Sequence, residues 1–147
     1  MTADTPELLL CDSSFVGHLR VRATAPERYE HWSAEDLARV DRGVLAISVV
    51  TLAEARFGYL KAGWGAPKIT AEEQRLRTFV WVPIDEAVIE EWARIRALCE
   101  RSGWGMGDND IWIVAGASSR GIPLVTCDRD QRQIVDPKLE VIFFAPP

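Results

Sequence analysis

Short apolar runs alternate with longer stretches of helical periodicity along the whole chain. Each run spans four to six residues and is bounded by polar or turn-forming residues, which is typical of strands buried inside a sheet. The runs predict strands at residues 8–11, 44–47, 79–82, 122–126 and 139–144. Pro83 directly follows the third run, at a position where the missing N–H of proline ends a strand.

Between these strands, apolar residues recur at intervals of three and four, which predicts helices. Ser48, Thr70 and Asp85 are short polar residues placed to cap three of them. We expect helices to begin after Asp12 and Ser48, to occupy residues 34–40, 70–78 and 110–120, and to follow Asp85 as far as Gly103. Residues 20–33 are polar and contain a proline, so we expect a loop within them.

Strands that alternate with helices along a chain indicate successive βαβ units. We therefore expect an α/β fold of three layers, α/β/α, in which helices cover both faces of a short, mainly parallel sheet. No repeat, linker or low-complexity segment interrupts the pattern, and we expect one domain over residues 1–147. In such folds the active site lies beyond the carboxyl ends of the strands, where the strand order reverses.

The composition is that of a globular protein, with 48% hydrophobic and 27% charged residues among 147. No apolar run approaches the roughly 20 residues that span a bilayer, and the N-terminus lacks the pattern of a secretory signal. We therefore expect a soluble, cytoplasmic protein with no membrane association. The chain has an odd number of cysteines, Cys11, Cys99 and Cys127, which lie far apart in the sequence, so a disulfide framework is not expected. The two histidines have no partner at ligand spacing, which argues against a zinc site.

Four acidic residues occupy the ends of predicted elements. Asp12 and Asp128 each follow a predicted strand, Asp110 opens a helix, and Glu54 lies near the start of another. The carboxyl ends of parallel strands meet at one edge of a sheet, so we expect these four side chains to converge there. These four acids account for four of the five excess negative charges, so the rest of the chain is almost neutral. The net charge of −5 therefore does not exclude nucleic-acid binding.

Convergence of four carboxylates implies a cation, because like charges held close together raise one another's pKa and strain the fold. Ligands that are all oxygen, with no histidine or cysteine nearby, favour Mg²⁺ or Mn²⁺ over zinc. Such ions activate water and neutralise charge that develops on a phosphodiester, which is the chemistry of nucleases. Taken singly, each acid could instead be a helix cap, a turn residue or half of a surface ion pair.

Two segments near the C-terminus carry a specific resemblance. They read Asn-Asp110-Ile-Trp-Ile-Val-Ala-Gly-Ala and Gly-Ile-Pro-Leu-Val-Thr126-Cys-Asp128-Arg-Asp130, and they resemble the Asn-Asp-x-Trp-Ile-Ala-Ala helix and the Leu-Val-Thr-x-Asp-x-Asp strand end of PIN-domain ribonucleases. Leu-Leu-Leu-Cys-Asp12-Ser-Ser resembles the opening strand of that family, and Ser-Val-Val-Thr-Leu-Ala-Glu54 resembles its glutamate helix. Together the four motifs cover nearly the whole chain in order.

This resemblance implies that Asp12, Glu54, Asp110 and Asp128 are both the catalytic and the metal-binding residues of an endoribonuclease that uses Mg²⁺ or Mn²⁺. It further implies supporting roles for Ser14, Thr126 and Asp130. The motifs are most similar to those of VapC-type toxins from bacterial type II toxin–antitoxin pairs. Such proteins cut RNA, are held inactive by a small antitoxin and are usually homodimers, so we expect an RNA substrate, a cognate antitoxin and a homodimer.

Several positions depart from the motifs or lie outside them. Gln131 replaces a phenylalanine that is common after the last acid pair, and Gly116 stands where threonine is usual. Asp108 adds an acid two residues before Asp110, and the assignment of Asp110 depends on the Ile-Trp-Ile that follows it. Trp64 and Trp104 each lie between two glycines in a predicted loop, where they could stack on an unpaired RNA base, contact a partner or anchor the loop to its own domain.

Three other functions compete with a toxin nuclease. A phosphoacceptor or phosphatase domain also places aspartate at a strand end, but Asp12 is followed by two serines rather than by a second aspartate two positions on, and no lysine follows a late strand. An RNA- or protein-binding module without catalysis is disfavoured, because four acids retained without a metal would repel one another. An RNA-processing nuclease outside any toxin–antitoxin pair stays open.

Overall fold

A computed structural model describes residues 5–147, and its centre is a sheet of five parallel strands. The strands are β1 (Leu8–Cys11), β2 (Val44–Ser48), β3 (Val80–Val82), β4 (Leu124–Thr126) and β5 (Val141–Phe143). Their order across the sheet is β3-β2-β1-β4-β5, and every neighbouring pair is parallel. The predicted strands are thus present, within two residues of their expected bounds.

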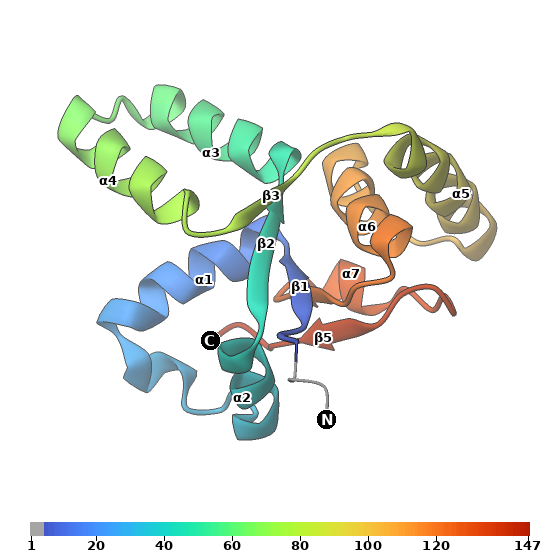
Figure 1. Ribbon diagram of the computed structural model, residues 1–147, viewed down its shortest axis with the longest axis horizontal. Coiled ribbons are helices and arrows are strands. Elements are labelled where there is room, and N and C mark those ends of the chain that lie inside the picture. Colours follow the sequence, from blue (N-terminus) through green and yellow to red (C-terminus); the bar gives the residue numbers. More distant parts are fainter. Residues whose placement is uncertain (1–4) are drawn as a thin grey trace.

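Helices connect the strands and cover both faces of the sheet (Figure 1). They are α1 (Ser13–Thr24), the short 3₁₀ helix η1 (Pro26–Tyr29), α2 (Ala34–Arg42), α3 (Val49–Ala62), α4 (Ala66–Leu76), α5 (Glu86–Ser102), α6 (Asp108–Arg120) and α7 (Arg129–Arg132). Within residues 5–147, no helix is long and apolar enough to cross a membrane.

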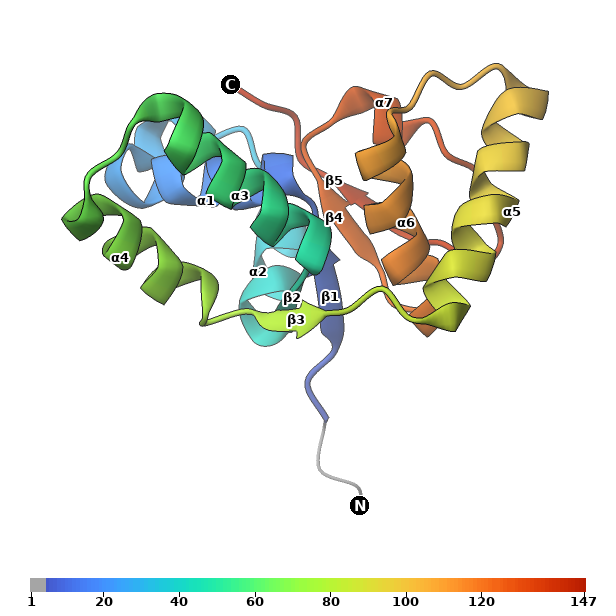
Figure 2. The same ribbon diagram turned by 90° about the horizontal axis from the view of Figure 1, so that it is seen from above.

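Two hydrophobic cores lie on the two faces of the sheet, because successive strand residues point in opposite directions. In β1, Leu9 and Cys11 pack into one core with residues of α1 and α2, whereas Leu10 packs into the other with residues of α5 and α6. Figure 2 shows the sheet between these two groups of helices. The expected three-layer α/β/α architecture is therefore confirmed.

Helices α2 and α6 each extend two residues beyond their expected bounds, and larger departures occur at α4 and at the end of α1. Helix α4 begins at Ala66 and not after Thr70, since Gly65 is its N-cap and Pro67 lies in its first turn, where proline has no N–H to leave unpaired. Helix α1 continues to Thr24, so the expected loop within residues 20–33 begins only at Ala25. The exposed side of α1 is polar there, which hides the helical period.

The strand order reverses between β1 and β4. The chain passes outward from β1 through β2 to β3 on one side, and β4 and β5 lie on the other side. The crevice beyond the carboxyl ends of β1 and β4 is therefore the expected place for a site. Helices α3 and α4 form a hairpin that projects past the sheet beside α1, and its turn uses Gly63 in the left-handed conformation (φ 64°) (Figure 1).

Candidate active site

Asp12 forms the floor of the crevice, directly after β1. Its side chain is 2% exposed and caps α1, because Oδ1 accepts a hydrogen bond from the backbone N–H of Phe15 at 2.8 Å. The hydroxyl of Ser14 donates to the same oxygen at 2.7 Å, and the hydroxyl of Thr126 donates to Oδ2. Burial raises the pKa of Asp12, while these three donors oppose the rise and the charge of Asp128 adds to it.

Ser14 and Thr126 join β1 to β4 at this edge. The Ser14 hydroxyl accepts from the backbone N–H of Cys127 at 3.0 Å, and the Thr126 hydroxyl accepts from that of Asp128 at 2.9 Å. Each hydroxyl thus donates to Asp12 and accepts from the segment that follows β4. These contacts are consistent with the supporting roles that the motifs imply for both residues.

Asp128 follows β4 and caps the short helix α7. Its Oδ1 accepts a hydrogen bond from the backbone N–H of Asp130 at 2.8 Å, and its side chain is partly exposed. Asp130 itself lies in the first turn of α7 and is exposed. Asp128 therefore lies at the carboxyl end of β4, next to β1 and Asp12, and Asp130 follows it on the surface.

Asp110 lies in the first turn of α6, on the other side of the crevice. Its pKa is raised from the ordinary value of 3.8 to about 6, first by burial and then by the charges of Asp128, Asp12 and Glu54, while the side chain of Gln131 opposes the rise by hydrogen bonding. All three other candidate acids thus lie close enough to Asp110 to act on its ionisation.

Asp108 starts the same helix but takes no part in this group. Its carboxylate is exposed and pairs with Arg96 of α5 at 3.1 Å. Arg96 already neutralises the charge of Asp108, so this aspartate does not need a metal ion. Asp110, in contrast, lies near other carboxylates. The structure thus places Asp108 in a surface ion pair and Asp110 among the other candidate acids.

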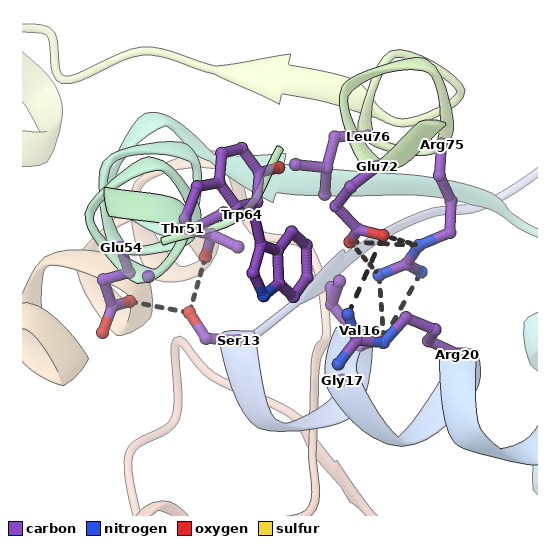
Figure 3. A pocket seen from close by; sticks show the side chains of 13 residues that line it. Ser13, Val16, Gly17, Arg20, Thr51, Glu54, Trp64, Glu72, Arg75 and Leu76 are labelled. Atoms are coloured by element: carbon purple, nitrogen blue, oxygen red, sulfur yellow. Dashed lines mark hydrogen bonds and ion pairs between the residues drawn. The ribbon is translucent and has the colours of Figure 1, made fainter. Parts of the chain in front are cut away.

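Glu54 reaches the crevice from α3 and is exposed. The Ser13 hydroxyl donates to its Oε1 at 2.7 Å and lies 3.0 Å from the hydroxyl of Thr51 (Figure 3). Ser13 and Thr51 were not among the residues expected at the site. The available signals were the position of Ser13 next to Asp12 and that of Thr51 one helical turn before Glu54.

The four carboxylates form a loose group. Among residues 5–147, no three His, Cys, Asp or Glu side chains stand in an arrangement that could hold a metal ion as they are. The chemistry of the group nevertheless fits a hard cation, because its donors are carboxylates with hydroxyls around them and because burial and mutual repulsion raise the pKa of both Asp12 and Asp110. Carboxylates drawn together around an ion would lose that repulsion.

An open pocket of about 310 Å³ lies between α1, α3 and α4 and includes Glu54 in its lining (Figure 3). Ser13, Thr51 and Glu54 line the end that meets the crevice. Trp64 and Tyr59 form a wall, and Arg20 lies at the far end with the ion pair of Arg75 and Glu72.

The chain resembles known proteins in sequence and in structure. The model of the PIN domain matches residues 9–137. Ribonuclease VapC5 of Mycobacterium tuberculosis is 39% identical over 92 residues, which are 58% of this chain and 65% of that protein. The chain thus spans slightly less than two thirds of the length of this relative.

Two solved structures also match. A crystal structure of VapBC-5, a member of the VapBC family of toxin–antitoxin systems from M. tuberculosis, is 36% identical and covers 67% of this chain and 81% of its own, with a TM-score of 0.55. VapBC2 from Rickettsia felis, bound to a DNA fragment from its promoter, is 18% identical and covers 93% of this chain and 98% of its own, with a TM-score of 0.71, which supports the fold. The matched region includes all four candidate acids, and the chain belongs to the PIN-domain family.

Proposed function

We propose that this protein is an endoribonuclease that requires a divalent metal ion and hydrolyses RNA phosphodiesters. The observation that carries the proposal is the raised pKa and crowded setting of Asp110, on which carboxylates from three other parts of the chain act. Groups with such perturbed ionisation, gathered in a cleft at a topological switch point, are typical of active sites. The ribonuclease relatives support the reaction class.

Asp12, Glu54, Asp110 and Asp128 are the residues that would hold Mg²⁺ or Mn²⁺. When bound, such an ion supplies Lewis-acid chemistry, lowering the pKa of water and neutralising charge on a phosphate. The chain's own contribution is to position the acids. Ser14 and Thr126 fix both oxygens of Asp12, and Ser13 fixes one oxygen of Glu54. Side chains held in this way need little reorganisation during the reaction.

We further propose that the protein is the toxin of a toxin–antitoxin pair, acting on cytoplasmic RNA as a homodimer that a small antitoxin inhibits. The support is the similarity to VapC5 and to the VapBC-5 toxin–antitoxin structure. Co-expression with the antitoxin from the same operon should give a stable complex without ribonuclease activity. Growth arrest that follows expression of the protein alone, and that the antitoxin relieves, would separate a toxin from an RNA-processing nuclease.

The direct test is cleavage of a mixed RNA pool by the purified protein, with Mg²⁺, with Mn²⁺ and with EDTA. We expect metal-dependent cutting that Asp110→Asn abolishes and Asp108→Asn preserves. The two variants remove one charge from the same helical turn, but only the first lies among the acids. If neither the wild type nor Asp110→Asn cuts RNA, although both are folded and free of antitoxin, the result would support a binding module without catalysis.

A further inference from the structure

The pocket between α1, α3 and α4 reaches the group of acids at Glu54. Ser13, Thr51 and Glu54 line it, and the same three residues form the hydrogen-bonded set around the Glu54 carboxylate. Its volume of about 310 Å³ lies at the lower end of the range of about 300 to 1,000 Å³ that small-molecule sites occupy. Whatever fills the pocket therefore lies directly beside Glu54 (Figure 3).

The wall of the pocket is a stack of two aromatic rings. Trp64 lies on Tyr59 with ring centroids 5.2 Å apart and an interplanar angle of 18°. Tyr59 is buried and holds the indole from behind, whereas Trp64 is partly exposed in the pocket. A rigid, partly exposed indole is the usual platform for an unpaired nucleobase, since every base offers a flat π-face.

Cations accompany the aromatic wall. The Lys68 ammonium stands 3.9 Å from the centroid of the Trp64 ring, and the Arg20 guanidinium stands 5.9 Å from it. The Lys68 side chain is exposed, and about half of Arg20 is exposed with a long 4.0 Å contact to Glu72 as its ion pair. Because Tyr59 covers the indole from one side, a base that stacked on Trp64 would have to displace the exposed cation over the ring, which would then be free to meet a phosphate.

We propose that this pocket binds a single unpaired base of the RNA substrate, stacked on Trp64 and next to the phosphodiester that is cut. The inference rests on the proposed ribonuclease function and adds a recognition site to it. The aromatic stack, the two flanking cations and the shared border with the acids together match a nucleotide with a flat base and a charged backbone. The substrate must then present that base unstacked, as single strands and loops do.

Binding can be measured without cleavage. The full chain carrying Asp110→Asn is titrated in Mg²⁺ buffer into short single-stranded RNA in which 2-aminopurine replaces one base at a time. We expect strong fluorescence quenching at one nucleotide beside the mapped cut site and weak quenching elsewhere. Quenching that is uniform along the strand, or absent at every position of an RNA that binds, would overturn the proposal.

Trp64→Ala in the same background should weaken RNA binding by about 5- to 150-fold, the range for loss of one stacked base. Trp64→Phe, which keeps a flat ring, should weaken it by only a few fold. Trp104→Ala is the matched control, since Trp104 also lies between two glycines after a helix but packs against the core on the other face of the sheet. We expect it to leave affinity unchanged.

A double-mutant cycle that combines Trp64→Ala with removal of one RNA base isolates the contact between Trp64 and that base. An RNA that lacks the base at the quenched nucleotide should bind the Trp64 form as weakly as Trp64→Ala binds intact RNA, and the two changes together should add nothing more. If Trp64→Ala weakens binding equally for intact and abasic RNA, no base stacks there. If it weakens the antitoxin complex and not RNA binding, the pocket belongs to a protein partner and the proposal fails.

These results are distinguishable from failure of the proposed function. Site-specific quenching that depends on Trp64, from a protein that cuts no RNA with Mg²⁺ or Mn²⁺, would retain the base pocket and reject the nuclease. Cleavage that is unchanged in rate and KM by Trp64→Ala would retain the nuclease and reject the pocket.

Discussion

Replacing Asp110 with asparagine should stabilise the metal-free protein. The pKa of Asp110 rises from 3.8 to about 6 in the fold, and a rise of that size corresponds to about 3 kcal/mol at about 1.36 kcal/mol for each pH unit. Asparagine removes this cost but also loses the favourable interaction of a carboxylate with the first turn of a helix, about 0.3 to 1 kcal/mol. The net expectation is a gain of ~2 kcal/mol at pH 7.5.

The pH dependence follows from the direction of the shift. Because the folded pKa of Asp110 lies above its unfolded value, the folded state binds more protons between about pH 4 and pH 6, and ionisation of this group lowers stability as the pH rises. The gain from Asp110→Asn should therefore be complete above about pH 7 and should shrink towards zero near pH 4. Saturating Mg²⁺ should cancel it, because a bound cation removes the repulsion in the wild type.

Urea unfolding in EDTA, followed by circular dichroism between pH 4 and pH 8, measures this difference. Asp108→Asn is the control for helix charge, since Asp108 lies in the same turn but pairs with Arg96 on the surface. We expect it to lower stability by less than about 1 kcal/mol at every pH. A gain for Asp110→Asn that does not vary with pH, or no gain at pH 7.5, would refute the idea that burial and the neighbouring acids disfavour ionisation of Asp110.

Three further substitutions test other contacts. Thr126→Val removes a hydroxyl that donates to buried Asp12, so it should lower the free energy of unfolding by about 1 to 3 kcal/mol in urea and also lower RNA cleavage. Gly116→Ala should raise the melting temperature, because alanine favours the helix by up to ~1 kcal/mol and its Cβ would lie 3.4 Å from the nearest leucine of β1, an ordinary contact. Arg94→Met leaves the buried carboxylate of Asp136 without its ion pair and should cost ~2 kcal/mol at pH 7 in the same urea assay, with a smaller cost in acid as that carboxylate protonates.

Periodicity predicted the elements well but two of their boundaries poorly. The apolar strands are buried on both faces, so their signal is strong and local. The start of α4 lies before Thr70, the cap that the pattern indicates, because Pro67 in the first turn can begin a helix. The pattern defines no end for α1, because most residues of its last turn face solvent and only Val21 there packs against the core.

The nearness of Asp12 and Asp128 was predictable, because topology alone gathers the carboxyl ends of parallel strands. The residues that form hydrogen bonds with the acids were only partly predictable. Ser14 and Thr126 were inferred from family motifs, whereas Ser13 meets Thr51 across 38 residues of sequence through the crossing of α1 and α3. No periodic pattern encodes that crossing. Trp104 and Trp64 have the same local sequence, and only the structure separates a loop anchor from the wall of a pocket.

Asp12 also has a structural role. The same carboxylate that belongs to the candidate site caps α1 and links β1 to β4 through two hydroxyls. Loss of this residue would damage folding as well as the proposed chemistry, so the fold requires Asp12 even without catalysis. Glu54 is exposed and has one hydrogen bond, and it could be lost at little structural cost. In descendants of this fold, the glutamate on α3 is therefore the more informative marker of an active enzyme.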